Sequence, residues 1–119
     1  MNQSDVERAI KGISEGLSGV IAISVVDINS GMSLGAITNS PSFDPDVASA
    51  YNAEVVKQKM AAMKALKIDN QSIEDVLITL SEHIHIIRVT SDKQHFVYVA
   101  CKKETNLAMA RSVIKTNCP

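Results

Sequence analysis

Three histidines are the first candidates for chemistry in this sequence. His83 and His85 are two residues apart, so both side chains point to one face if the segment is a strand. Zinc needs three or four ligands within about 2.3 Å of one point. We predict that His95 pairs with Thr90 in a hairpin, roughly 17 Å along the ladder from His85, so the three histidines do not converge. A two-histidine site in a dimer stays open, but we favour a solvated or core-edge position for them.

The two cysteines, Cys101 and Cys118, are candidates for a nucleophile or a disulfide. They flank a predicted helix of about twelve residues, whose ends are roughly 18 Å apart, whereas a disulfide needs Cα atoms within about 7 Å. Lys102 and Lys103 follow Cys101 and would lower its pKa, but the predicted register puts Ile84 opposite it and no histidine base. We therefore predict two reduced thiols, with Cys101 a small buried hydrophobic residue.

Other catalytic constellations are missing from the sequence. It contains neither common type of glycine-rich phosphate loop. Glu74 and Asp75 are adjacent on a predicted strand and point to opposite faces, so they cannot act as a paired acid and base. Arg88 and Arg111 have no acidic cluster beside them, and a structural hydrogen bond is the simpler role for Arg111. We expect no enzyme activity, no cofactor, no stoichiometric zinc and no nucleotide hydrolysis.

The composition predicts one small globular domain over residues 1–119. Apolar residues make up 45% of the chain and aromatic residues only 3%, so aliphatic side chains must fill the core. Twelve basic and 13 acidic residues are spread along it without the basic block that would bind nucleic acid or a membrane surface. We read no signal peptide and no membrane span, since the longest apolar run is 20–26. Reduced thiols then indicate the cytoplasm.

Helix and strand signals give the element order α-β-β-α-β-β-β-α. Ser4 and Glu7 form a predicted capping box for the first helix, while Gly12 and Gly16 weaken that helix and make it dependent on packing. The turn at 27–31 has Asp, Asn and Gly in the positions that favour a turn. The predicted elements are helix 4–17, strands 20–26 and 32–37, helix 45–67, strands 73–80, 84–90 and 95–102, and helix 105–116.

Short links between the strands predict an antiparallel sheet of five strands, in the α/β (α+β) class. The hairpin at 91–94 pairs Thr90 with His95 and Ile86 with Val99. Both faces of these two strands are then largely apolar, so helices are expected on both faces of the sheet.

The helix that follows Asp44 carries the strongest functional signal in the sequence. Asp44 is a good capping residue and Pro45 suits the first helical position. At 100° per residue the apolar side chains form two sectors, whereas a surface helix needs only one. The broad sector contains Val47, Ala48, Tyr51, Val55, Ala62 and Leu66, and the second sector contains Ala53, Val56, Met60 and Met63.

We predict that the broad sector packs in the chain's own core and that the second sector meets a second copy of the chain. The alternative is that the second sector packs under a loop of the same chain. Met60→Glu separates the two: it would part the subunits in the first case and unfold the chain in the second.

Three short segments, together with the element order, resemble the roadblock family, which includes the roadblock dynein light chains and the bacterial and archaeal regulators of small GTPases. Residues 17–21, Leu-Ser-Gly-Val-Ile, resemble its junction between the first helix and first strand. The turn at 27–31 resembles its first strand–strand turn, here lengthened. Residues 106–111, Asn-Leu-Ala-Met-Ala-Arg, are similar to its closing-helix signature Asn-Leu-Gly-Leu-Ala-Arg, with Ala108 in place of glycine.

This resemblance implies a roadblock/profilin-like fold and a homodimer. Roadblock domains pair through the second helix and the edge strand beside it, which makes one continuous sheet across two subunits. The dimer-interface residues expected here are Ala53, Val56, Met60, Met63, Ile73, Val76 and Ile78.

The function that the resemblance implies is a non-catalytic interaction module that regulates or docks a small GTPase or a motor-type complex. A scaffold or assembly subunit without regulatory activity is the first alternative, and a small-molecule sensor is the second. The scarcity of aromatic and convergent polar residues argues against the sensor.

Overall fold

The computed structural model describes residues 1–119 and shows eight elements in the predicted order. They are α1 (Gln3–Gly16), β1 (Val20–Asp27), β2 (Ser33–Thr38), α2 (Pro45–Ala65), β3 (Asp75–Thr79), β4 (His83–Val89), β5 (His95–Lys102) and α3 (Leu107–Asn117). The prediction of element types is confirmed, and the boundaries move by a few residues. No helix combines the length and apolar character needed to cross a bilayer.

The five strands form one antiparallel sheet in the order β2-β1-β5-β4-β3. β1 and β5 are far apart in the sequence and adjacent at the centre of the sheet, and Val20–Val26 is buried throughout, as its continuous apolar run predicts. The predicted hairpin register is confirmed, because Ile86 lies opposite Val99 and the backbone N–H of Thr90 donates to His95. β2 and β3 are the two edge strands.

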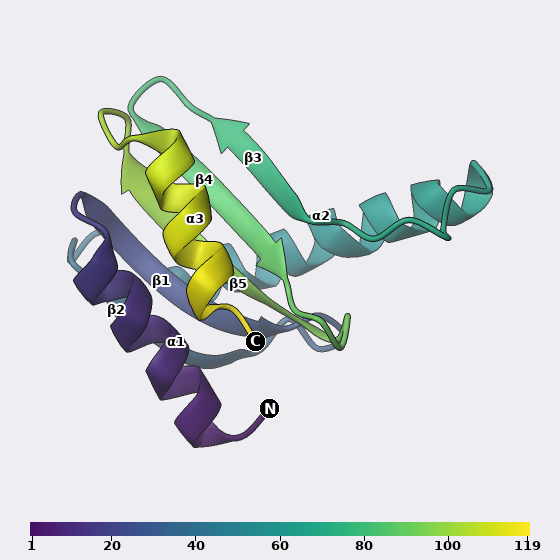
Figure 1. Ribbon diagram of the computed structural model, residues 1–119, viewed down its shortest axis with the longest axis horizontal. Coiled ribbons are helices and arrows are strands. Elements are labelled where there is room, and N and C mark those ends of the chain that lie inside the picture. Colours follow the sequence, from purple (N-terminus) through teal and green to yellow (C-terminus); the bar gives the residue numbers. More distant parts are fainter.

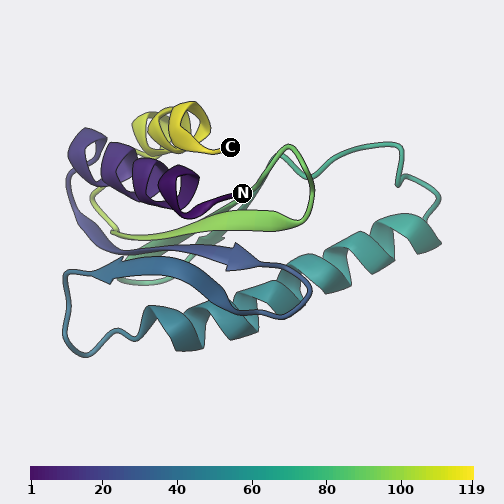
Figure 2. The ribbon, with the colours of Figure 1, turned by 90° about the horizontal axis from the view of Figure 1, so that it is seen from below.

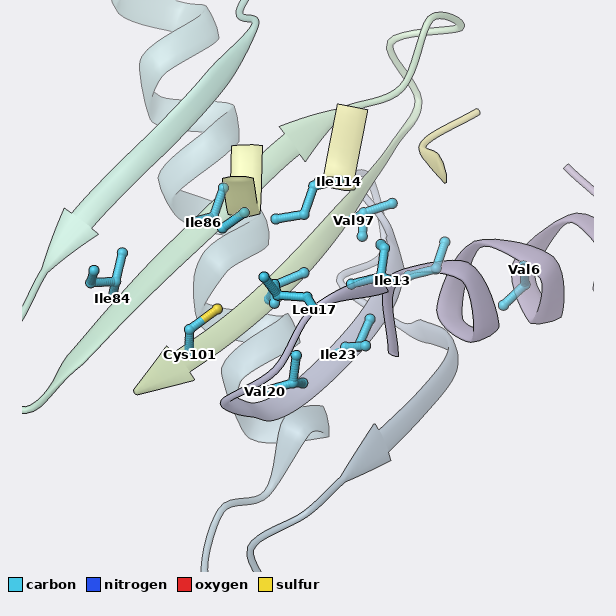
Figure 3. Packing of buried hydrophobic residues seen from close by; sticks show 13 residues of the cluster. Val6, Ile13, Leu17, Val20, Ile23, Ile84, Ile86, Val97, Cys101 and Ile114 are labelled. Carbon is cyan, nitrogen blue, oxygen red and sulfur yellow. The ribbon is translucent and has the colours of Figure 1, made fainter. Parts of the chain in front are cut away.

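Helices cover both faces of the sheet, as predicted. α1 and α3 lie side by side on one face and α2 lies alone on the other (Figure 1, Figure 2). Ile13 of α1 and Ile114 of α3 pack with Ile23, Ile86 and other sheet residues in the main core (Figure 3). The N-terminus before α1 and the C-terminus after α3 lie near each other in both views.

The capping box of α1 lies two residues before the predicted one. Asn2 caps the helix: its side chain accepts from the backbone N–H of Asp5 at 2.8 Å, and its own N–H donates to the Asp5 carboxylate at 3.1 Å. The prediction of Ser4 and Glu7 is wrong because the helix already begins at Gln3, and asparagine caps as well as serine does.

α2 is a 21-residue helix, about 31 Å long, that begins as predicted. Asp44 caps it by accepting from the backbone N–H of Asp46 at 2.9 Å, and Pro45 follows. The helix packs on β1 and β2, and its C-terminal half extends beyond the edge strand β3 (Figure 1, Figure 2). Its last turns therefore have little sheet of their own chain to cover.

Candidate protein-interaction surface

The structure separates His95 from the other two histidines. Its Nδ1 lies 3.0 Å from Asp92 and its Nε2 lies 3.9 Å from Asp27, next to the hairpin at the start of β5. His83 and His85 lie at the far end of the neighbouring strand β4, opposite Lys102 and Ala100. No group of three histidine, cysteine or acidic side chains has a geometry suited to one metal ion.

His83 and His85 belong to a small aromatic cluster on the α2 side of the sheet. Their ring centroids are 5.6 Å apart, Phe43 lies beside both, and the Tyr98 hydroxyl is 3.1 Å from Nδ1 of His85. Burial and the neighbouring His83 lower the pKa of His85, and burial raises the pKa of Tyr98. Both directions favour the neutral forms of the two groups.

The cysteines carry no sign of nucleophilic activation. Cys101 is fully buried, opposite Ile84 as predicted, and points into the main core (Figure 3). Burial raises the pKa of Cys101 to about 11 and that of Cys118 to about 11. The lowering of the Cys101 pKa that Lys102 and Lys103 suggested does not occur, because burial raises this pKa and only a hydrogen bond with Thr105 opposes the rise. Both cysteines are free thiols, as predicted.

Arg111 has the structural role that the sequence suggested. Its Nε and Nη2 donate to the two carboxylate oxygens of Asp75 at 2.8 and 3.4 Å, which joins α3 to the edge strand β3. The carboxylate raises the pKa of Arg111 further. Sequence reasoning missed the partner because Asp75 is 36 residues away and belongs to a different element.

The second apolar sector of α2 is covered by residues of the same chain. Ala53 and Val56 are fully buried, Met63 is 8% exposed, and the half-buried Met60 packs on the same core cluster as Ala53 and Val56. The prediction that these side chains meet a second copy is wrong for Ala53, Val56 and Met63, because they have almost no surface left to offer. The alternative of packing within the chain holds for them: Ala53 and Val56 pack against the sheet, and Met63 lies beside the segment between α2 and β3.

The broad sector of α2, expected in the core, faces solvent except at Ala48, which is half-buried against the core cluster beneath the helix. Tyr51 is 74% exposed, Leu66 is 65% exposed and Val55 is 40% exposed, and Val47 and Ala62 are exposed as well. We call these five residues the outer stripe of α2. Exposed apolar side chains in a row on one helix face are unusual on a protein that acts alone, because they forgo burial that stabilises the chain by about 25 cal/mol per Å².

The edge strand β3 lies beside the uncovered part of α2. Ile73, Val76 and Ile78, three residues of the predicted interface, are half-buried, and Val76 packs on the core cluster beneath α2. β3 pairs with β4 on one side only, so its outer backbone groups are unpaired and able to accept a further strand. The outer stripe and this edge form one candidate interaction surface.

Comparisons with solved structures find the same architecture in bacterial proteins. A roadblock/LC7 domain from Streptomyces avermitilis is 12% identical over 90% of this chain and 86% of that one, with a TM-score of 0.76. The gliding protein MglB from Thermus thermophilus is 14% identical over 98% and 87%, with a TM-score of 0.77. MglC from Myxococcus xanthus is 19% identical over 95% and 92%, with a TM-score of 0.61.

No protein-family model and no curated protein matches the chain. All three identities to solved structures are at most 19%, so the likeness is one of fold, extending over nearly the whole length of each chain.

Proposed function

We propose that this chain, which has the roadblock fold, is a non-catalytic homodimeric module that binds a small GTPase and regulates or docks it. The GTPase comes from the resemblance to roadblock regulators, and one of the similar structures is described as MglB in a tetrameric arrangement, so assembly of copies occurs in a protein of this fold. The two free thiols support a location in the cytoplasm.

The observation that carries the homodimer is the overhang of α2 beyond β3. The helix continues past the edge of its own sheet, and Leu66 on this overhang is 65% exposed (Figure 1). A second copy that pairs its β3 with this β3 would join two five-stranded sheets into one and place its own sheet over the overhang. Val55 of the outer stripe borders the edge of β3, so by two-fold symmetry this flank of each α2 meets the partner at the same time.

The first test replaces Val55 with Glu. Val55 lies in the middle of the outer stripe and is 40% exposed, so a carboxylate there is harmless to the single chain but costly in an apolar contact. We expect the parent to sediment as a dimer at micromolar concentration and Val55→Glu to sediment as a monomer with an unchanged circular dichroism spectrum. Met109→Glu is the matched control, because Met109 is a 58% exposed apolar residue of α3, on the opposite face of the sheet.

Two outcomes would overturn a dimer formed through α2 and β3. The parent sediments near 12.8 kDa over a wide range of concentration, or Val55→Glu remains a dimer while Met109→Glu dissociates. The second outcome would move the interface to the α1–α3 face.

The partner is tested separately. Small GTPases of the source organism, loaded with GTP or GDP, are mixed with the parent and with Val55→Glu, and complexes are measured by light scattering after size exclusion. A complex that depends on the bound nucleotide supports a regulator, and a complex that forms equally with both supports a docking role. Failure with every GTPase, beside stable complexes with other proteins, favours the scaffold.

A further inference from the structure

A hollow of about 480 Å³ lies where β4 ends, and it shares only Ile73 with the interaction surface described above. Its walls come from five parts of the chain: α2, the segment between α2 and β3, the end of β4, the β4–β5 hairpin and the end of α3. The hairpin and the end of α3 lie at the same end of the sheet in Figure 1. The volume falls in the range of roughly 300–1,000 Å³ that small-molecule sites occupy.

One side of the hollow is cationic. Arg88 from β4, Lys93 from the hairpin and Lys115 from α3 line it, and none of the three forms an ion pair. Asp75 lies directly opposite Arg88 in the ladder, but its carboxylate is bound by Arg111. The exposed Asp69 and Glu74 also line the hollow, so its lining carries three cationic and two acidic side chains.

The other side is apolar. Met60 and Met63 of α2 and Val89 of β4 line it, and all three are buried or half-buried. The thioether side chains of methionine adapt their shape to different ligands. The hollow therefore presents free cations at one end and a flexible apolar wall at the other, and both ends are supplied by a single chain.

We propose that this hollow binds a small organic anion, a carboxylate carried on an aliphatic chain. The carboxylate lies among Arg88, Lys93 and Lys115, where charge-assisted hydrogen bonds hold it. The aliphatic chain lies against Met60, Met63 and Val89 and leaves water. An ion with no apolar body fills only one end, and a neutral chain leaves the cations without a partner.

Calorimetric titration of the full chain with octanoate, octanamide and acetate tests this. We expect octanoate to bind once per chain, octanamide to bind roughly tenfold more weakly because it lacks the charge, and acetate to show no saturable binding. In nuclear magnetic resonance spectra, octanoate should shift the amide signals of Ile73, Val89 and Ser91 most.

The variant Arg88→Gln/Lys115→Gln should weaken octanoate roughly tenfold and leave octanamide unchanged, while the control Lys103→Gln, an exposed lysine away from the hollow, changes neither. If the double variant fails to fold, Lys115→Gln alone replaces it in the titration, because Lys115 is exposed. Val55→Glu should bind octanoate with the affinity of the parent. Octanoate binding therefore tests the hollow separately from the proposed dimer. Equal affinity for octanoate and octanamide, no binding of either, or shifts confined to another region would overturn the proposal.

Discussion

At the scale of single residues, Ser49 fixes the position of α2 on the sheet. Its hydroxyl is hydrogen-bonded to Ser24 of β1 at 3.0 Å and to the carbonyl of Pro45 at 2.6 Å, and both serines are fully buried. A buried hydroxyl without a partner costs about 1–3 kcal/mol, so this pair stabilises α2 only at the register where the two oxygens meet.

A double-mutant cycle on Ser24 and Ser49 tests this role. We expect Ser49→Ala to lower the free energy of unfolding by about 1–3 kcal/mol, since it leaves the Ser24 hydroxyl with no partner. Ser24→Ala should behave similarly, and the double variant should cost less than the sum of the two. Urea unfolding measures all four proteins. Additive losses would show that the two hydroxyls are not coupled.

Residue-scale chemistry was predictable where it followed from strand register. Alternation along the hairpin of β4 and β5 was enough to place Ile84 opposite Cys101 and to separate His95 from His85. The prediction that Cys101 is a small buried hydrophobic residue is confirmed, because its place opposite Ile84 follows from the same register.

At the scale of elements, α2 shows how counting apolar residues misassigns a helix face. The side that is buried or half-buried within the chain is the row Ser49, Ala53, Val56, Met60 and Met63. This row has regular spacings of three and four residues, but it begins with a serine and an alanine, so its total hydrophobicity is low. Small residues were the missed signal: they let the helix approach the sheet closely, while the larger apolar residues remain outside.

The glycines of α1 were interpreted correctly as a sign of packing. Gly12 faces Asn117 and Gly16 faces Val113, both on α3, and a side chain on either glycine would enter α3. The two helices approach each other closely at these positions, which compensates for the low helix propensity of glycine.

Gly12→Val tests the contact between α1 and α3. The added side chain has to displace Asn117, so we expect a loss of about 1–3 kcal/mol in the free energy of unfolding. Ser14→Val is the control, because Ser14 is an exposed residue of the same helix and valine there carries only the small propensity cost. Chemical denaturation measures both variants. Equal losses would show that α3 is not packed tightly on Gly12.

At the scale of the whole molecule, the sequence was sufficient for the fold and insufficient for the surface. Apolar residues at helix or strand spacing, turn residues and helix caps predict the order of the elements. The short links between strands predict an antiparallel sheet. Which face of α2 remains free depends on the angle at which the helix crosses the sheet, and this angle is set by contacts between distant segments. The overhang beyond β3 follows from that angle (Figure 2).

The proposed dimer makes stability depend on protein concentration. If the overhang of α2 is covered only by a second copy, the native dimer and two unfolded chains are in equilibrium, and each tenfold rise in concentration favours the dimer by about 1.4 kcal/mol. For two chains of this length, we expect the unfolding midpoint of the parent to rise by roughly 2–3 °C per tenfold concentration. Calorimetric scans between micromolar and millimolar protein measure it.

Val55→Glu should behave differently in the same scans. A monomer has no partner to lose, so its midpoint should lie below that of the parent and stay constant with concentration. Met109→Glu should follow the parent, since Met109 lies on the face covered by α1 and α3. A parent midpoint that is flat from micromolar to millimolar protein would contradict the dimer even if the two variants differ in stability. In that case the outer stripe of α2, with Tyr51 and Leu66 exposed, would have to be covered by a different protein.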